Sequence, residues 1–231
     1  MSLMTHQMYD LYIGNKNYSS WSLRPWVLLK ELGIPFRERN VVFGKDTFTD
    51  FSPTGKVPCL VDGKQTIWDS LAITEYVGER HANVWPVDAP ARAWARSAAA
   101  EMHSGYSELR NVCTMNCGVR VKLKTVSPAL LRDLARLEEL WADGLNRFGG
   151  PFLTGARFCA VDAFYAPVAF RIQTYEPPIN VTARRYAAQL LALPSMQEWY
   201  RAALAETTRD EPHEAELKGI GEITADLRAT N

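Results

Sequence analysis

Apolar positions along the first eighty residues follow two different periods. Short alternating or continuous apolar runs indicate β-strands, and apolar residues three or four positions apart indicate helices. An Asp62-Gly63 pair, typical of a tight hairpin turn, separates two of the short runs. The pattern predicts a β-α-β-β-α order: a strand at 9–13, a helix at 22–32, a strand at 36–42, a hairpin of strands 59–61 and 66–68, and a helix that Ser70 caps.

The rest of the chain carries almost only helical periods. One long pattern covers 91–124, with a bend or break expected near Gly105 or Gly118. Residues from Glu206 onward are polar and charged, and form either a short extra helix or a loose tail. Further helices are predicted at 128–148, 163–170, 182–193 and 194–205.

Prolines bracket the short polar link at 85–90, where we expect a domain boundary. The predicted organisation is therefore a domain at 8–84 that contains the strands, followed by an all-helical domain at 91–231.

The hairpin and the helix after it suggest a ligand site. Pro58 has no N–H, and it pushes Val57 into an extended conformation in which the Val57 backbone can pair with a peptide-like ligand. The free N–H groups where the helix begins at Ser70 suit a carboxylate. The expected ligand is therefore peptide-like and carries a carboxylate. The alternative is a hairpin followed by an ordinary capped helix.

A second candidate is the serine-rich loop that leads into the first helix. Its hydroxyls, at Ser19, Ser20 and Ser22, lie near a helix N-terminus, where a thiolate gains from hydrogen bonds and from the helix dipole. Lowering a thiol pKa by about 2 units needs roughly 3 kcal/mol of differential stabilisation. The alternative is that these serines only cap the helix.

The runs Gly55-Lys56-Val57-Pro58 and Trp68-Asp69-Ser70-Leu71-Ala72-Ile73 resemble the glutathione-binding half of the cytosolic glutathione transferase family. The resemblance covers roughly residues 8–205. It implies an α/β thioredoxin-like amino-terminal domain followed by an all-α carboxy-terminal domain, with a cis proline at Pro58. It also implies that glutathione lies along Val57, with its γ-glutamyl end on Asp69 and Ser70 and with Lys56 near its backbone or glycyl carboxylate.

The serine loop is similar to the serine-type members of that family, particularly the zeta class. Aligned on the arginine of the following helix, Ser19 takes the place of the catalytic serine and Ser20 that of its neighbour. Trp21 replaces the zeta-class cysteine, which argues against maleylacetoacetate isomerisation but leaves glutathione binding intact. Tyr18 is the alternative hydroxyl for the sulfur. Tyr12 is nearer the position used by tyrosine-type classes, and we expect it to be packed.

The family binds its second substrate between the two domains, against the first long helix of the second. Aromatic and Met residues on a helix stripe are usually core, and single arginines are usually solvated. The arginine that zeta enzymes use for the substrate carboxylate is not in register here, a second point against isomerisation. The candidates by position are Trp21, Tyr106, Arg110, Met115, Asn116, Arg120 and Arg171.

In the family, a Ser or Thr three residues before an aspartate caps a buried helix of the second domain. Asp162 matches the aspartate, but Cys159 occupies the cap position. Because a thiol is a weak acceptor, the cap must depend on Asp162. We assign Asp162 to folding rather than to catalysis.

Composition narrows the possible partners. The 231 residues include 26 basic and 26 acidic ones, so charge offers no case for nucleic acid or an anionic membrane. No apolar run approaches a membrane span, and the first ten residues lack the pattern of a signal peptide. The four histidines show no metal-ligand spacing, and Cys113 and Cys117 would share a helix face as buried thiols. A cytoplasmic protein without a bound metal is expected.

The sequence thus predicts a cytoplasmic glutathione transferase, homodimeric like its relatives, with a role in detoxification. Ser19, helped by Ser20, would hold the glutathione thiolate for attack on an electrophilic carbon or a peroxide. Two alternatives remain. One is a glutathione-binding or interaction protein of the same fold without turnover, and the other is a maleylacetoacetate isomerase-like enzyme.

Overall fold

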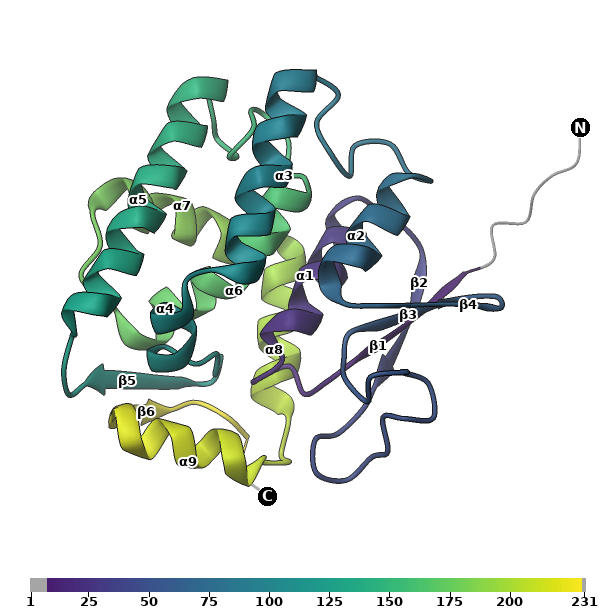
Figure 1. Ribbon diagram of the computed structural model, residues 1–231. Helices are drawn as coiled ribbons and strands as arrows, with labels where there is room; N and C mark the ends of the chain where they lie inside the picture. Colours follow the sequence, from purple (N-terminus) through teal and green to yellow (C-terminus); the bar gives the residue numbers. More distant parts are fainter. Residues whose placement is uncertain (1–7, 230–231) are drawn as a thin grey trace, which may run out of the picture.

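The computed structural model describes residues 8–229 of the chain (Figure 1). Residues 1–7, which make up most of the stretch searched for a signal peptide, and residues 230–231, the end of the predicted second domain, lie outside the described residues. Within 8–229, a four-stranded sheet with two helices precedes a part built mainly of helices. The predicted fold class is confirmed.

The sheet has the strand order β2-β1-β3-β4. The central strand β1 (Tyr9–Ile13) runs parallel to β2 (Phe36–Asn40) and antiparallel to β3 (Cys59–Asp62). The predicted hairpin is formed by β3 and β4 (Gln65–Trp68). Parallel neighbours need a crossover connection, and α1 (Ser20–Glu31) supplies it.

Helix α1 joins the two parts of the molecule. It contacts β1 and α2 (Ser70–Gly78) on one side and helices of the second part on the other (Figure 1). Trp26, Val27 and Leu29 are completely buried because α1 is covered on both sides. The residues that begin α1 are therefore held rigidly between the sheet and the helical part.

The second part surrounds α6 (Ala160–Tyr175), nearly all of whose residues are buried. Such a helix lacks a polar face because neighbours cover it all round. The helices around it are α3 (Ala89–Ser104), α4 (Ser107–Val112), α5 (Pro128–Phe148), α7 (Val181–Leu191), α8 (Pro194–Ala205) and α9 (Glu211–Ile220).

The break expected near Gly105 in the helical pattern over 91–124 is confirmed, but the helix predicted for the end of that range is wrong. The chain leaves α3 at Gly105, where a Cβ atom would lie 2.8 Å from the backbone oxygen of Glu101. It turns through Tyr106 in a left-handed conformation (φ 54°) and resumes as the short α4. Val119–Leu123 then forms β5 instead of helix. The alternation of apolar and charged residues in β5 is a strand signal that the helical reading missed.

The polar carboxy-terminal segment is ordered rather than loose. After α9, the strand β6 (Gly221–Asp226) pairs antiparallel with β5. The second part is therefore not purely helical. The two strands lie about a hundred residues apart in the chain, so no local sequence pattern could reveal their pairing.

Asp162 performs the structural role predicted for it. Its carboxylate accepts hydrogen bonds from the N–H groups of Cys159 (2.9 Å) and Leu153 (3.0 Å) and from the Tyr186 hydroxyl (2.7 Å). Burial raises the pKa of Asp162 to about 6, although these donors favour the ionised form. The carboxylate thus ties the start of α6 to α7 and to the loop before it.

The cysteines are free and buried. Burial raises the pKa of the Cys59 thiol to about 11 and that of Cys113 to about 12, so both stay protonated at neutral pH. Cys113 ends α4 and Cys117 lies in the loop beyond it, so the shared helix face predicted for this pair does not exist.

None of the helices within residues 8–229 is both long enough and apolar enough to cross a membrane. In the same range, no group of three or more His, Cys, Asp or Glu side chains could hold a metal ion.

Candidate functional site

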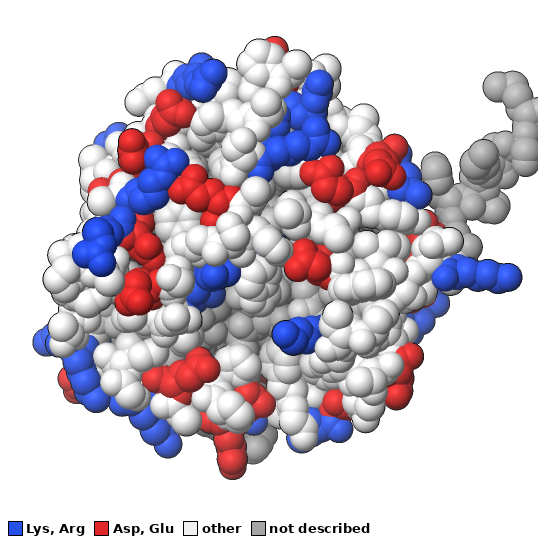
Figure 2. All heavy atoms as spheres, in the orientation of Figure 1, with Lys and Arg blue, Asp and Glu red and all other residues white. Residues whose placement is uncertain are grey.

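Two pockets adjoin at the junction between the sheet and the helical part. The larger has a volume of about 950 Å³ and the smaller about 480 Å³. Trp21, Lys56 and Val57 line both of them. The molecular surface is hollowed at this junction, where uncharged side chains predominate (Figure 2).

The smaller pocket contains the predicted peptide-binding segment. Lys56, Val57, Pro58, Asp69 and Ser70 all line it, and the Val57–Pro58 peptide bond is cis as the resemblance implied. The β1–β3 ladder ends at the Tyr12–Cys59 pair, so Val57 lies just beyond the paired part of its strand. An extended ligand can add to the chain at such a position through main-chain hydrogen bonds.

Asp69, not Ser70 as predicted, caps α2. Its Oδ1 accepts a hydrogen bond from the Leu71 N–H at 2.7 Å, and its Oδ2 lies 3.5 Å from Nε2 of His103. Asp69 has a φ of 73°, a conformation that costs a non-glycine residue on the order of 1–3 kcal/mol. The exposed carboxylate is thereby held at the rim of the smaller pocket.

The adjacent serines have different environments. Ser19 is 5% exposed, and its hydroxyl donates to Oγ of Ser22 at 2.7 Å. It stands at the N-cap position of α1, yet its side chain makes no capping hydrogen bond. Ser20 is less buried, and its Oγ accepts a hydrogen bond from Nη2 of Arg171 at 3.3 Å. Both serines line the larger pocket.

The two tyrosines considered for the sulfur, Tyr18 and Tyr12, make other contacts. The Tyr18 hydroxyl donates to Glu214 at 2.8 Å, and burial together with this hydrogen bond raises the Tyr18 pKa well above its usual value. Tyr12 stacks on Phe51 with ring centroids 4.1 Å apart, which fits the predicted packing role. The Tyr18 ring still forms part of the pocket wall.

Buried arginines surround the serines with positive charge. Burial and the nearby Arg171 and Arg110 lower the pKa of Arg24 to about 9, and burial lowers that of Arg171 to about 10. Both values lie above neutral pH, so both guanidinium groups remain cationic although burial disfavours their charge. The indole of Trp21 lies over Arg24, 4.2 Å from its guanidinium carbon. The site is thus suited to an anion.

The other predicted substrate contacts divide into two groups. Arg110, Met115, Trp21 and Arg171 line the larger pocket. Tyr106, Asn116 and Arg120 line neither pocket. The Tyr106 hydroxyl donates to Glu101 (3.1 Å), the Asn116 amide to Glu214 (3.3 Å) and the Arg120 guanidinium to the Tyr200 hydroxyl (3.1 Å).

The sequence did not indicate six residues of the larger pocket: Phe43, Phe48, Asn111, Thr114, His213 and Glu216. The phenylalanines belong to the loop between β2 and β3. His213 and Glu216 belong to the segment left undefined after Glu206. A Pro at the second position of α9, with Asp210 as cap, was the available signal for a helix there.

The structure therefore combines a thioredoxin-like sheet domain and a helical part with two adjoining pockets, one lined by the cis-proline segment and the other by Ser19 and Ser20. Residues 18–80 match the family model of the glutathione S-transferase N-terminal domain, and residues 125–202 match that of the C-terminal domain. The two matches together span more than half of the chain, which belongs to the glutathione S-transferase family.

Individual relatives agree with this placement. The chain is 27% identical over 202 residues to a zeta-class glutathione S-transferase of Euphorbia esula, covering 83% of this chain and 84% of that protein. It is 32% identical over 113 residues to a probable maleylacetoacetate isomerase of Caenorhabditis elegans, covering 47% and 53%. A glutathione transferase homologue from Burkholderia, solved with bound glutathione, aligns with a TM-score of 0.64 at 25% identity, covering 85% and 98%.

Proposed function

We propose that this chain is a glutathione transferase in which the smaller pocket holds glutathione and the larger pocket holds an electrophile. The observation that carries the proposal is the junction of the two pockets at Val57 and Trp21, directly in front of the first residues of α1. A tripeptide paired with the Val57 backbone would extend its cysteine toward Ser19 and Ser20.

Each end of glutathione has a matching group. The γ-glutamyl end would meet Asp69 and Ser70 at the start of α2, where its ammonium pairs with the Asp69 carboxylate and its carboxylate with free N–H groups. Lys56 would lie near the glycyl carboxylate. It precedes Val57 in the chain, whereas Asp69 and Ser70 follow it, and it lines both pockets.

Within the pair of serines, the geometry favours Ser20 as the donor to the thiolate. The Arg171 guanidinium already donates to Ser20 Oγ, so the Ser20 hydroxyl proton is left free to point at sulfur. The hydroxyl proton of Ser19 is engaged with Ser22. Ser19 would then position the loop. The resemblance had instead implied that Ser19 is the main donor to the sulfur and that Ser20 helps it.

The pocket supplies enough stabilisation to ionise the thiol. A helix N-terminus contributes about 0.3–1 kcal/mol, and a charge-assisted hydrogen bond about 1.5–3 kcal/mol. Arg171 lies behind Ser20 and adds a buried positive charge. Together these contributions reach the roughly 3 kcal/mol that a fall of about 2 units in the thiol pKa requires.

The thiolate would attack an electrophilic carbon or a peroxide in the larger pocket. Phe43, Phe48 and Met115 suit the apolar body of such a substrate, and Arg110 suits negative charge that develops on it. Isomerisation is a second candidate because one relative is named a probable maleylacetoacetate isomerase. Trp21, in place of the zeta-class cysteine, weighs against it.

The test combines binding with turnover. We expect the protein to bind glutathione resin and to conjugate chloro-dinitrobenzene or reduce cumene hydroperoxide in a glutathione-dependent reaction. Retention on resin without turnover of either substrate would favour a non-catalytic binding protein. Turnover of maleylacetone alone would identify the isomerase instead.

We also propose that the enzyme acts as a homodimer in the cytoplasm, with a domain boundary at residues 85–90. Its buried free cysteines fit a reducing compartment. Light scattering during size-exclusion chromatography would give twice the 26.0 kDa chain mass for a dimer.

A further inference from the structure

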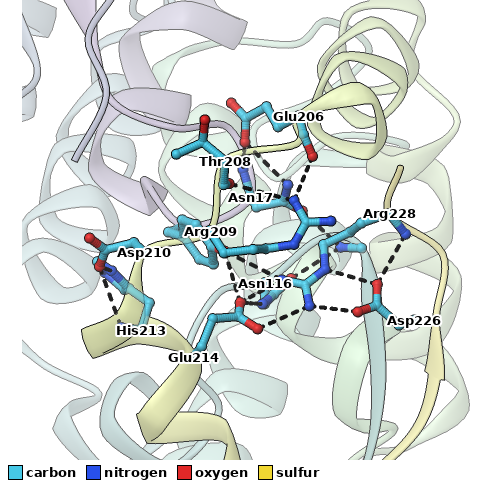
Figure 3. A network of polar contacts seen from close by, with 12 residues as sticks. Asn17, Asn116, Glu206, Thr208, Arg209, Asp210, His213, Glu214, Asp226 and Arg228 are labelled. Carbon is cyan, nitrogen blue, oxygen red and sulfur yellow. Dashed lines mark hydrogen bonds and ion pairs between the residues drawn. The ribbon is translucent and has the colours of Figure 1, made fainter. Parts of the chain in front are cut away.

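A histidine of the carboxy-terminal helix faces the larger pocket. His213 lies in the first turn of α9 and lines the pocket together with Ser19 and Ser20. Its Nδ1 lies 2.5 Å from Oδ2 of Asp210 (Figure 3). With Nδ1 occupied by the carboxylate, Nε2 is the ring nitrogen that remains for a molecule in the pocket.

Ring contacts fix the orientation of this imidazole. It stacks on Tyr18, with centroids 4.9 Å apart, and on Phe43 at 5.4 Å. Asp210 has a side chain only 10% exposed and also caps α9. His213 is thus held between two aromatic rings and a carboxylate, as an oriented acid or base requires.

The segment that carries His213 is attached to the same loop that carries the serines. Glu214 accepts from the Tyr18 hydroxyl and pairs with the buried Arg228, and the Glu206 carboxylate accepts from the backbone N–H groups of Lys16 (2.6 Å) and Asn17 (3.2 Å) (Figure 3). These bonds fix α9 relative to the start of α1. The distance between His213 and a thiolate at Ser20 is therefore set by the fold.

We propose that His213, oriented by Asp210, is the general acid for electrophiles that take up a proton on oxygen, namely epoxides and α,β-unsaturated ketones. The proposal rests on the proposed glutathione transferase function. It adds a catalytic residue and a substrate class to that function.

The chemistry balances with glutathione and the electrophile alone. For an epoxide, the thiolate sulfur forms a bond to a ring carbon, the bond from that carbon to oxygen breaks, and the electron pair moves to oxygen. The imidazolium of His213 gives its Nε2 proton to that oxygen. The proton released when the next glutathione thiol ionises restores the imidazolium, and the product is a hydroxy thioether.

The environment of His213 supports this direction of transfer. Because Oδ2 of Asp210 contacts Nδ1, the proton to be transferred is the one on Nε2, and the two stacked rings hold the imidazole in that orientation. Tyr18, the titratable neighbour from the opposite loop, has its proton directed to Glu214 and does not compete. Asp210 acts through His213 and is a positioning residue.

The test compares two kinds of electrophile in the full-length protein. Attack on chloro-dinitrobenzene expels chloride and needs no proton, whereas attack on nitrophenyl glycidyl ether or phenylbutenone needs one. We expect His213→Gln to lower kcat/KM by about 100-fold for the glycidyl ether and the enone, and by less than about threefold for chloro-dinitrobenzene. Asp210→Asn retains a capping side chain, so it should give the same selectivity with a smaller loss.

A matched control is Glu211→Gln, which removes a carboxylate from the same helical turn at an exposed position outside both pockets. It should leave both reactions unchanged. An equal loss in His213→Gln for all electrophiles, or no loss for any, would overturn the role of His213. So would a wild-type protein that uses chloro-dinitrobenzene but neither oxygen electrophile. A wild-type protein inactive with every electrophile would instead overturn the proposed function itself.

Discussion

Ser19 and Ser20 show how neighbouring residues of one type acquire different chemistry. Both line the larger pocket, but Ser19 is buried and donates its hydroxyl proton to Ser22, whereas Ser20 is less buried and accepts a hydrogen bond from Arg171. A hydroxyl whose oxygen accepts from a guanidinium donates its proton more strongly, because the positive charge polarises it. The difference arises from α6, which brings Arg171 against the loop.

Ser20→Ala should therefore raise the pKa of bound glutathione by about 1–2 units and lower kcat about 10- to 100-fold at neutral pH, with little change in glutathione affinity. Thiolate absorbance of the enzyme–glutathione complex measures the pKa directly. Ser19→Ala is the matched comparison and should change the thiol pKa less. A larger pKa change in Ser19→Ala would show that Ser19, as the family resemblance implied, is the main donor to the sulfur.

At the scale of the element, two features support the helical part: the cap of α6 and the attachment of α9 and β6. Gly118 shows how closely the second is packed, since a Cβ there would lie 2.1 Å from Cγ of Arg228. Arg228, with a side chain 3% exposed, pairs with Glu214 on α9 and Asp226 on β6. One guanidinium thus joins both elements to the loop of Tyr18.

Arg228→Met should detach this segment, because removing one partner of a buried ion pair costs about 3–5 kcal/mol. We expect faster hydrogen exchange and proteolysis after residue 206 and lower turnover. Glutathione affinity should persist, since no residue of α9 lines the smaller pocket. Lys218→Met, which removes an exposed cation from the same helix, is the control. Unchanged exchange in Arg228→Met would show that Arg228 does not hold the segment.

The cap of α6 predicts a pH dependence of stability. Burial raises the folded-state pKa of Asp162 from 3.8 to about 6, so the folded state binds more protons than the unfolded state between these values. The contribution of Asp162 protonation to the free energy of unfolding is complete below about pH 4 and is lost as pH rises through about 6. Over the whole window this amounts to about 3 kcal/mol.

Asp162→Asn removes the titrating carboxyl group. It also replaces one carboxylate oxygen by an amide NH2 group, so one of the three hydrogen-bond donors to this side chain then faces another donor. The variant should be less stable by about 2–4 kcal/mol. In urea unfolding, wild type should lose about 1 kcal/mol more than the variant between pH 5 and about pH 7.5. The difference between the two pH profiles cancels the contribution of titratable groups that both proteins contain, such as Glu206. Parallel pH profiles would mean that Asp162 titrates alike in the folded and unfolded states.

At the scale of the whole molecule, the site exists only because two parts of the chain meet. Val57, Asp69 and the serines come from the sheet domain, and Arg110, Arg171 and His213 from the helical part. Charged side chains of both signs are interspersed on the face that contains the hollow (Figure 2). Within the larger pocket, the positive charge comes from Lys56, Arg110 and Arg171.

Because binding engages residues at the junction, glutathione should stabilise the entire fold. A concentration of about 100 times Kd adds about 2.7 kcal/mol to the free energy of unfolding. Asp69→Ala should reduce this gain at the same glutathione concentration, since it removes the partner of the γ-glutamyl ammonium. Thermal unfolding with and without glutathione measures both proteins, and Asp50→Ala, at an exposed position outside both pockets, is the control. An equal gain in Asp69→Ala would exclude Asp69 from the binding site.

The sequence by itself determined the elements whose causes are local. The alternating strands, the Asp62-Gly63 turn, the Val57-Pro58 pair and the role of Asp162 all depend on residues a few positions apart. The tertiary structure decided that Arg171 contacts Ser20, that β5 pairs with β6, and that His213 lines the larger pocket. The physical reason is that these features depend on contacts across a hundred residues or more, whose energy no local pattern encodes.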